Sequence, residues 1–222
     1  MDKILFQITG AVLLSYMIGS IPFGLLIGKL FYKKDIRELG SKNIGATNIM
    51  RTFGTFPGVS VLLLDALKGF LCVVFIPGLF GITAAAAAFT GDTSRFLPIL
   101  ISASILCGLA AIVGHNWSFF LKFKGGKGVA TSIGVALALA PIEAIVAFSA
   151  FAILVFLTRY VSVGSIIGSI IFPVTMFFSG ESLPLQLFGV LACVMIIIRH
   201  LPNIKRLYKG TENKIWQKKL QL

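Results

Sequence analysis

The hydropathy of this chain alternates between long apolar runs and short, mostly basic segments. The apolar runs cover about residues 4–30, 57–79, 96–114, 129–157, 161–178 and 185–198. The hydrocarbon core of a bilayer is about 30 Å thick, so a run of roughly 20 apolar residues predicts a membrane-spanning helix. Charged residues make up only 13% of the chain, whereas soluble domains contain roughly a quarter. The sequence therefore predicts an all-α, polytopic integral membrane protein, with a single domain over residues 1–222.

Some of these runs contain residues that interrupt helices. Gly19 and Pro22 lie late in the first run, and membrane helices tolerate a break or kink at such positions. Pro141 divides the run of residues 129–157, where a pair of short spans fits the charge pattern better than one tilted helix. The last two runs are short for a bilayer, which predicts tilt or local thinning. Between the second and third runs, the tract Ala84–Ala88 is able to extend a helix.

Lysine and arginine orient the predicted spans, because cytoplasmic loops carry an excess of both. Nearly all of them fall in Lys29–Arg51, Lys122–Lys127, Arg159 and Arg199–Lys219, which leaves Lys3 and Arg95 for the opposite side and Lys68 within a span. An odd number of spans, about seven or alternatively five, places these basic segments together in the cytoplasm. The N-terminus is then outside and the C-terminus cytoplasmic. Membrane topology thus accounts for the net charge of +12, and no nucleic-acid partner is expected.

A glycine-rich basic stretch, KFKGGKGVAT, occupies residues 122–131 between two apolar runs. Gly125, Gly126 and Gly128 let the backbone turn tightly and approach a ligand closely. The N–H groups of such a turn at the start of a helix bind anions, and Lys127 adds a full charge. The stretch is not a Walker A loop, because that motif has Ser or Thr after its lysine and this chain has Gly128. We interpret the stretch, which ends at Thr131, as a phosphate-binding loop; a flexible, positively charged membrane loop is the alternative.

The first polar segment, LGSKNIGATNIMR at residues 39–51, mixes small residues with hydroxyl, amide and cationic groups. The side chains able to donate hydrogen bonds to phosphate oxygens are Ser41, Asn43, Thr47 and Asn48. Arg51 can hold such oxygens bidentately. A polar interhelical loop with an asparagine cap is the alternative interpretation.

A further polar cluster follows the last apolar run. His200 and Asn203 are three residues apart, so they share one face of a helical turn. A basic tail that anchors on anionic lipid is the alternative, but it explains Lys205 and Arg206 and leaves His200 and Asn203 without a reason. Ser165 lies near the start of the run 161–178, the sixth predicted span, at the same predicted face, where helix packing alone would also explain it.

Four other polar residues receive structural interpretations. Asp65 and Lys68 lie three residues apart in the second run and can pair along one helix face. Ionisable residues inside a membrane are costly, so a functional site is the general expectation, but here we favour a structural ion pair. His115 and Trp117 are interpreted as marks of the membrane interface, where amphipathic rings settle.

The inventory of reactive residues is small. Acidic residues number 8 and histidines 2, and their arrangement fits neither a Ser-His-Asp triad nor a metal site. Cys72, Cys107 and Cys193 lie in apolar runs and are interpreted as packing residues. The chain therefore favours holding phosphate groups and positioning reactants over supplying a covalent nucleophile. Neither a cofactor nor a metal is expected.

Four stretches carry a family resemblance: GSIPFGLLIGKL, DIRELGSKNIGATNIMRTFG, HNWSFFLKFKGGKGVAT and HLPNIKRLYKGTENKI. Together, and in this order over nearly the whole chain, they resemble the bacterial acyl-phosphate:glycerol-3-phosphate acyltransferase family, known as PlsY. The resemblance implies a seven-helix enzyme of the bacterial plasma (inner) membrane whose active site faces the cytoplasm. Its reaction would move an acyl chain from acyl phosphate to the sn-1 hydroxyl of glycerol 3-phosphate, giving lysophosphatidic acid and phosphate in the first step of phospholipid biosynthesis. A functional link to an acyl-carrier-protein-dependent acyl-phosphate synthase is also implied.

The resemblance also assigns roles position by position. It places Ser41, Arg51 and Lys127 around glycerol 3-phosphate, and Thr47, Gly125, Ser165, His200 and Asn203 around the acyl phosphate. The expected catalytic residues are then Ser41, Lys127, His200 and Asn203, and the expected substrate-binding residues are Asn43, Thr47, Asn48, Arg51, Gly125, Gly126, Gly128, Thr131 and Ser165. His200 or Asn203 would stabilise the oxyanion. No residue is an evident strong base, so a substrate phosphate oxygen is expected to take the hydroxyl proton; a His200 general base is the competing hypothesis.

Two other classes of protein are alternatives. A phosphate transporter would place polar groups along a path to the bilayer midplane, whereas here they crowd one predicted side apart from Asp65 and Lys68. An acyl-coenzyme A acyltransferase of the His-x4-Asp type needs aspartate five residues after histidine. The residues at that spacing are Phe120 and Lys205, so the sequence excludes this type.

Overall fold

The computed structural model describes residues 2–82 and 93–215 of the 222 in the chain. All regular elements in those ranges are helices. The long helices are α1 (Asp2–Gly19), α4 (Thr55–Val74), α7 (Thr93–Asn116), α9 (Pro141–Thr158), α10 (Val161–Phe178) and α11 (Leu183–Tyr208). The shorter ones are α2 (Phe23–Tyr32), α3 (Ala46–Phe53), α5 (Ile76–Leu79), α8 (Val129–Leu139) and the single turns η1 (Ile36–Glu38) and η2 (Phe119–Leu121).

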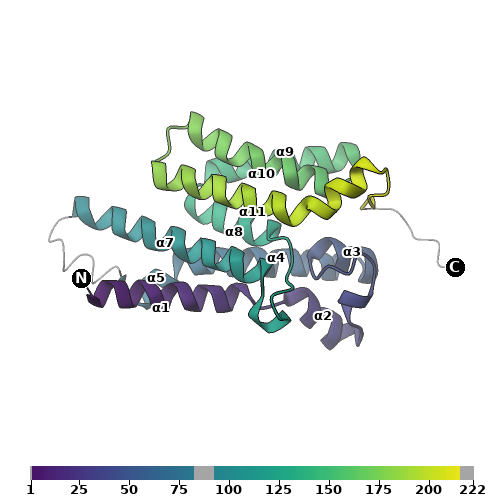
Figure 1. Ribbon diagram of the computed structural model, residues 1–222, viewed down its shortest axis with the longest axis horizontal. Helices are drawn as coiled ribbons and strands as arrows, with labels where there is room; N and C mark the ends of the chain where they lie inside the picture. The colour runs from purple at the N-terminus through teal and green to yellow at the C-terminus, as the bar shows by residue number, and fades with distance from the viewer. Residues whose placement is uncertain (1, 83–92, 216–222) are drawn as a thin grey trace.

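The long helices lie side by side along the longest axis of the molecule (Figure 1). One group is formed by α1, α4 and α7, and the other by α9, α10 and α11. The short helix α8 packs against α4 on one side and α9 on the other, so it joins the groups. Its Val135 belongs to a buried apolar cluster with Ile112 of α7, Phe172 of α10 and Phe188 of α11. The two groups therefore share one core.

The lengths of the helices bear out a membrane protein. Six helical segments are long and apolar enough to cross a bilayer, and Val129–Leu139 is a shorter apolar helix. With 11 residues, α8 rises only about 16 Å, roughly half the hydrocarbon thickness. The chain divides at Ala140, and Pro141 occupies the first turn of α9, as the predicted break at Pro141 requires. The sixth predicted span, 161–178, matches α10.

The predicted break in the first apolar run is confirmed. α1 ends at Gly19 and Pro22 caps α2, which leaves carbonyl groups without helical partners. Ser118 Oγ donates to the Ser20 carbonyl at 2.6 Å, and Lys68 Nζ donates to the Ile21 carbonyl at 2.8 Å. Side chains of neighbouring helices thus satisfy the backbone that the break exposes, which is how membrane helices tolerate interruption.

The predicted end of the last span was wrong. α11 has 26 residues and continues past Ile198 through Pro202 to Tyr208, so this span is not short. The apolar run stops where polar side chains begin, but the helix continues because those side chains find partners in the structure. The second predicted span divides into α4 and α5. The tract Ala84–Ala88 lies outside the described residues.

Candidate active site

The polar segments of the sequence meet at one end of the helix bundle. They line a cavity of about 850 Å³, counting the part open to solvent. Ten of the predicted site residues line it: Ser41, Asn43, Thr47, Asn48, Arg51, Lys127, Gly128, Ser165, His200 and Asn203. Three do not: Gly125, Gly126 and Thr131. The lining comes from α3, α4 and α7 to α11, from the loops before α3 and α8 and from the segment after α11.

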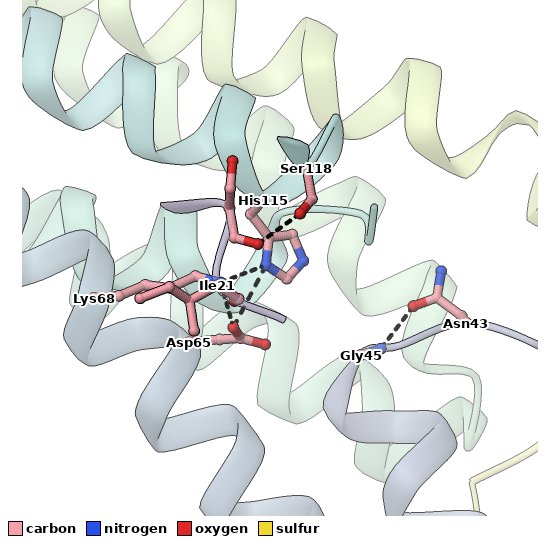
Figure 2. A network of polar contacts seen from close by, with 8 residues as sticks. Ile21, Asn43, Gly45, Asp65, Lys68, His115 and Ser118 are labelled. Carbon is pink, nitrogen blue, oxygen red and sulfur yellow. Dashed lines mark hydrogen bonds and ion pairs between the residues drawn. The ribbon is translucent and has the colours of Figure 1, made fainter. Parts of the chain in front are cut away.

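Two asparagines shape the first loop. Asn48 is buried, and its Oδ1 accepts the Ser41 N–H at 2.9 Å while its Nδ2 donates to the Asn43 carbonyl at 2.8 Å and the Leu39 carbonyl at 3.1 Å. Asn43 Oδ1 accepts the Gly45 N–H at 2.8 Å at the start of α3 (Figure 2). The amide of Asn48 is thus engaged by the loop backbone, which it holds in place beside the cavity.

The glycine-rich loop depends on close backbone approach. A Cβ on Gly125 would collide with the His115 carbonyl, and one on Gly126 would collide with the His115 ring. Gly128 has a φ of +81°, and a Cβ there would lie 2.6 Å from Asn116 Oδ1. The Gly126 N–H donates to the His115 carbonyl at 2.9 Å. Gly125 and Gly126 therefore fit the loop against the end of α7, while Gly128 begins α8 at the cavity wall.

Arg199 fixes the same loop from α11. Its Nε donates to the Gly126 carbonyl at 2.8 Å and its Nη2 to the Gly125 carbonyl at 2.9 Å. The guanidinium also lies over the Trp117 ring, 5.6 Å from its centroid. The planar fork of arginine suits two neighbouring carbonyl oxygens. Sequence reasoning had treated Arg199 only as part of a basic segment and missed this role.

Thr131 lies in the first turn of α8 and does not line the cavity. Its side chain is fully buried, and its hydroxyl has no hydrogen-bond partner among the described residues. A Cβ on Gly69 of α4 would collide with its carbonyl. Thr131 therefore packs where α8 meets α4, and any effect on a ligand in the cavity is indirect.

Lys127 lies in the cavity among other cations. Burial is the main effect that lowers its pKa, to about 8; Glu212 raises it, and Arg206, Arg51 and Arg199 lower it further. An anion in the cavity would favour the charged form of Lys127. The cationic side chains around Lys127 therefore favour an anionic ligand in the cavity.

Glu212 connects three elements of the cavity wall. Its Oε1 accepts from Asn203 Nδ2 at 2.6 Å and from Ser162 Oγ at 2.9 Å, and its Oε2 accepts from Arg206 Nε at 2.7 Å. Burial raises the pKa of this carboxyl, but the hydrogen bonds from Asn203, Arg206 and Ser162 outweigh it and hold the pKa below its ordinary value. Sequence reasoning quoted Glu212 without giving it a role. The sequence feature that could have pointed to Glu212 is that it is an isolated carboxylate in a basic segment.

The guanidinium of Arg51 is hydrogen-bonded through Nη2 but not through Nε in the described part of the chain. Its Nη2 donates to the Asn213 carbonyl at 2.7 Å, while its buried Nε has no hydrogen-bond partner among the described residues. Burial lowers the pKa of the guanidinium, with Glu212 opposing and Arg206 adding to the shift. A buried donor without a partner is costly. A ligand oxygen in the cavity would satisfy it.

His200 and Ser165 are both anchored to their own helices. Nδ1 of His200 lies 2.8 Å from the Ile196 carbonyl, and Ser165 Oγ donates to the Val161 carbonyl at 2.9 Å. A carbonyl only accepts, so His200 carries a proton on Nδ1, and the neutral ring offers Nε2 as an acceptor. Neutral His200 therefore lacks the donor that the sequence interpretation gave it. Asn203 Oδ1 is likewise a buried acceptor without a partner among the described residues.

A buried polar network, drawn in Figure 2, borders the cavity through Asp65 and His115. Lys68 Nζ contacts Asp65 Oδ1 at 2.6 Å, the Ile21 carbonyl at 2.8 Å and His115 Nδ1 at 3.1 Å. The predicted pairing of Asp65 with Lys68 is therefore confirmed. His115 is buried at 5% exposure, so its interpretation as a mark of the membrane interface was wrong.

An apolar cavity of about 540 Å³, counting its open part, adjoins the polar one. Its walls come from α8, α9, α10 and α11, and include Ala147, Phe172, Phe188 and Cys193. Val129, Ile133, Phe151 and Ser165 line both cavities. A ligand with a charged head and a hydrocarbon tail fits this combination, because each part meets groups of its own polarity.

The chain matches a family model described as glycerol-3-phosphate acyltransferase over residues 9–210. It is 43% identical over 208 residues to glycerol-3-phosphate acyltransferase 2 of Moorella thermoacetica, covering 94% of this chain and 97% of that one. It is also 43% identical over 209 residues to the glycerol-3-phosphate acyltransferase of a Nostoc species, covering 93% and 91%.

Solved structures agree with these matches. The fold is similar to the crystal structure of PlsY, an integral membrane glycerol 3-phosphate acyltransferase, in its glycerol 3-phosphate form. The TM-score is 0.80 at 35% identity, with 93% of this chain and 94% of that chain covered. The lysophosphatidic acid form of PlsY gives a TM-score of 0.78 at the same identity. With its membrane-spanning helices, polar cavity and adjoining apolar cavity, the chain belongs to the glycerol-3-phosphate acyltransferase family, PlsY.

Proposed function

We propose that this glycerol-3-phosphate acyltransferase takes its acyl chain from acyl phosphate and transfers it to the sn-1 hydroxyl. The products are lysophosphatidic acid and inorganic phosphate. The observation that carries the proposal is the junction of a cationic cavity with an apolar one at Val129, Ile133, Phe151 and Ser165. The acyl carbonyl would lie at that junction, with its tail among α8 to α11.

Acyl phosphate suits the size and charge of the cavity. A coenzyme A thioester must also hold an adenine nucleotide and a pantetheine arm. The long connections among the described residues, 33–45 and 117–128, are already folded against the cavity. An acyl phosphate needs only an anion site beside an apolar groove. Lys127, Arg51, Gly128 and the first turn of α8 offer cations and backbone N–H groups for such a site.

The reaction requires no covalent enzyme intermediate. The sn-1 oxygen attacks the acyl carbonyl carbon, a new ester C–O bond forms, and the bond from that carbon to the phosphate oxygen breaks. Phosphate leaves with the electron pair of that bond. The hydroxyl proton passes to a phosphate oxygen of a substrate, so the protein mainly holds and orients the two reactants. Lys127 and a hydroxyl such as that of Thr47 can stabilise the charge that develops on the carbonyl oxygen.

His200 supports this step as an acceptor. With its Nδ1 proton committed to the Ile196 carbonyl, neutral Nε2 can receive a hydrogen bond from the attacking hydroxyl or from a protonated phosphate oxygen. It would thereby orient the lone pair of the nucleophile toward the carbonyl. We keep proton acceptance by the phosphate as the proposed route, since that group leaves in the same step and carries the negative charge.

The orientation in the membrane is part of the proposal. α1 begins and α11 ends at opposite ends of the bundle (Figure 1), and the six segments long and apolar enough to cross a membrane make seven together with α8 in the described residues. We propose that the N-terminus is outside and that the cavity opens to the cytoplasm of a bacterial plasma membrane. The enzyme would there receive acyl phosphate from an acyl-carrier-protein-dependent synthase, which links it functionally to that enzyme.

The donor is tested with purified protein. Palmitoyl phosphate, palmitoyl-coenzyme A and palmitoyl-acyl carrier protein are supplied in turn with glycerol 3-phosphate and a chelator, and the product is resolved by regiochemistry. Only palmitoyl phosphate should give lysophosphatidic acid, acylated at sn-1, with one phosphate released per ester formed. Robust product from either thioester would overturn the proposed donor, and an sn-2 ester would overturn the proposed regiochemistry.

A further inference from the structure

We propose that Asp65 is a specificity-determining residue, which accepts a hydrogen bond from the secondary hydroxyl of the glycerol 3-phosphate acceptor. The inference rests on the proposed reaction in the polar cavity and extends it to a residue that the family resemblance did not assign. It also replaces the interpretation of Asp65 as a purely structural partner of Lys68.

Asp65 lines the cavity that Lys127, Arg51 and His200 also line. It stands on α4, within a segment long and apolar enough to cross a membrane, and is only 2% exposed. An ionised carboxylate in such a place is costly unless it is paired. Lys68 supplies the pairing, but it does not explain why the carboxylate also borders the cavity.

The two oxygens of Asp65 have different surroundings. Oδ1 contacts Lys68 Nζ at 2.6 Å and lies 3.5 Å from His115 Nδ1. In Figure 2 the other oxygen points away from Lys68 and His115. Among the described residues no group donates a hydrogen bond to that oxygen. It is therefore available to a donor that enters the cavity.

The network also fixes which kind of ligand group can bind there. Lys68 Nζ donates to the Ile21 carbonyl and lies 2.6 Å from Asp65 Oδ1 and 3.1 Å from His115 Nδ1, so its ammonium is surrounded by groups of the protein. The free oxygen of Asp65 only accepts, so it attracts a hydroxyl and repels a phosphate or a ketone oxygen.

The cavity thus presents groups of opposite preference. Arg51, Lys127 and Arg206 favour the phosphate, and Asp65 favours a hydroxyl. Once the phosphate is held and the sn-1 oxygen faces the acyl carbonyl, the donor that remains on the glycerol backbone is the secondary hydroxyl. A hydrogen bond from that hydroxyl to Asp65 would hold the backbone in one rotational state, with the sn-1 oxygen aimed at the acyl carbonyl.

The test compares acceptors that differ at one atom. Glycerol 3-phosphate has the secondary hydroxyl, 3-hydroxypropyl phosphate lacks it, and dihydroxyacetone phosphate replaces it with a ketone. A hydrogen bond to a charged group predicts that wild-type kcat/KM is roughly 10- to 150-fold higher for glycerol 3-phosphate than for 3-hydroxypropyl phosphate. Equal values for those two acceptors in the wild-type enzyme would overturn the proposal before any variant is made.

The first variant, Asp65→Leu with Lys68→Met, removes the acceptor without leaving a buried charge unpaired. Its preference between glycerol 3-phosphate and 3-hydroxypropyl phosphate should fall to within about threefold, because only the better acceptor loses a contact. A purely structural pair would instead lower the rate with both acceptors alike and keep their ratio. The matched control is Glu143→Gln, a buried carboxylate on α9 that lines neither cavity, and it should keep the wild-type ratio.

The second variant, Asp65→Asn, predicts a change of preference even if the double variant does not fold. The amide oxygen must face Lys68, so the amide nitrogen turns toward the ligand as a donor. Activity with dihydroxyacetone phosphate should then rise roughly tenfold relative to glycerol 3-phosphate. An unchanged ratio in a folded Asp65→Asn enzyme would contradict the proposal. All ratios are measured with whichever acyl donor supports turnover, so failure of acyl phosphate as donor stays distinguishable from failure of this inference.

Discussion

The side-chain amide of Asn203 donates to Glu212 Oε1 over 2.6 Å, and this contact determines how both residues face the cavity. Glu212 only accepts, so Nδ2 of Asn203 must face it. Oδ1 of Asn203 is then a buried acceptor without a partner among the described residues. A residue on α11 and one in the following segment therefore present a single arrangement of acceptors and donors to the substrate.

Glu212→Gln should lower both stability and activity. The neutral amide cannot replace the charge-assisted acceptor that Asn203 and Ser162 share, and each hydrogen bond to a charged group is worth roughly 1.5–3 kcal/mol. We expect a lower Tm together with a higher KM for glycerol 3-phosphate, measured by thermal unfolding and steady-state kinetics in detergent. Glu38→Gln, at an exposed carboxylate, is the control and should change neither. Unchanged stability in Glu212→Gln would remove the carboxylate from its connecting role.

Acid should weaken the same contacts. The pKa of Glu212 is held below its ordinary value of 4.5, so its folded state binds fewer protons than the unfolded state near that pH. The stability it adds is complete above about pH 4.5 and is lost as pH falls through the lower folded pKa. Wild-type Tm should therefore decline on acidification more steeply than that of Glu212→Gln. Parallel declines would contradict this assignment.

Lys127 should give the enzyme opposite pH dependences for substrate binding and for stability. Its pKa, lowered to about 8 mainly by burial, means that the unliganded protein loses this charge as pH rises through about 8. KM for glycerol 3-phosphate should rise above that pH, because a neutral amine attracts phosphate less. The unfolded state binds more protons between about pH 8 and 10.5, so the stability of the unliganded protein should increase over that range. Lys127→Arg should remove both effects, and a KM that stays flat to pH 9.5 in the wild type would contradict the prediction.

Arg51→Ala should reduce kcat/KM for glycerol 3-phosphate by roughly 10- to 150-fold, the range expected for a charge-assisted contact. Arg51→Lys should recover only part of this loss, because an ammonium cannot keep the Asn213 contact and also hold phosphate through a planar fork. Lys42→Ala changes an exposed cation on the loop before α3 and should cost less than threefold. Equal losses at Arg51 and Lys42 would indicate general attraction of anions and would exclude a specific phosphate contact.

His200→Gln should retain more activity than His200→Ala. Glutamine supplies an acceptor oxygen in place of Nε2, whereas alanine supplies none. If His200 orients the hydroxyl and does not take its proton, the pH profile of the glutamine variant should keep the wild-type shape at a lower rate. A wild-type rate that follows a single ionisation absent from His200→Gln would establish a general base.

The membrane orientation is tested with cysteine labelling. Cys72, Cys107 and Cys193 are replaced by alanine, and single cysteines are introduced at Lys42, Lys124 or Lys209. All three positions should react with an impermeant reagent only from the cytoplasmic side, because they flank the same cavity end of the bundle. Labelling of any one from outside would separate the polar segments and contradict the proposed topology.

Hydropathy was enough to predict most helices and the breaks at Pro22 and Pro141. Bilayer thickness imposes a length on apolar runs, and proline removes a backbone donor wherever it stands. Hydropathy did not predict the end of α11, because it detects burial in lipid. The polar end of this helix is stabilised by contacts such as that of Arg206 with Glu212. Those contacts depend on residues that come together only in three dimensions.

The sequence was sufficient to predict which segments form the site, but not the hydrogen-bond partners of individual atoms. Loop chemistry placed Arg51, Lys127 and His200 in one cavity. The direction of each polar group followed from partners that sequence does not reveal, such as the Ile196 carbonyl at His200 Nδ1. The role of Arg199 could not be predicted for the same reason, since its partners are backbone carbonyls that any residue could provide.

Because both cavities lie along α11, this helix relates the length of a bound acyl chain to the position of its carbonyl. Phe188, Ala192, Cys193 and Ile196 line the apolar cavity, and His200 and Asn203 follow on the same helix in the polar one. From Phe188 to Ile196 the helix rises about 12 Å. This distance limits the length of acyl chain, counted from the carbonyl, that contacts the protein. Carbons beyond that length would contact lipid in place of protein. Selection by chain length should therefore be strict for short acyl groups and weak for long ones, and bulkier residues at Ala192 should shift the boundary toward shorter chains.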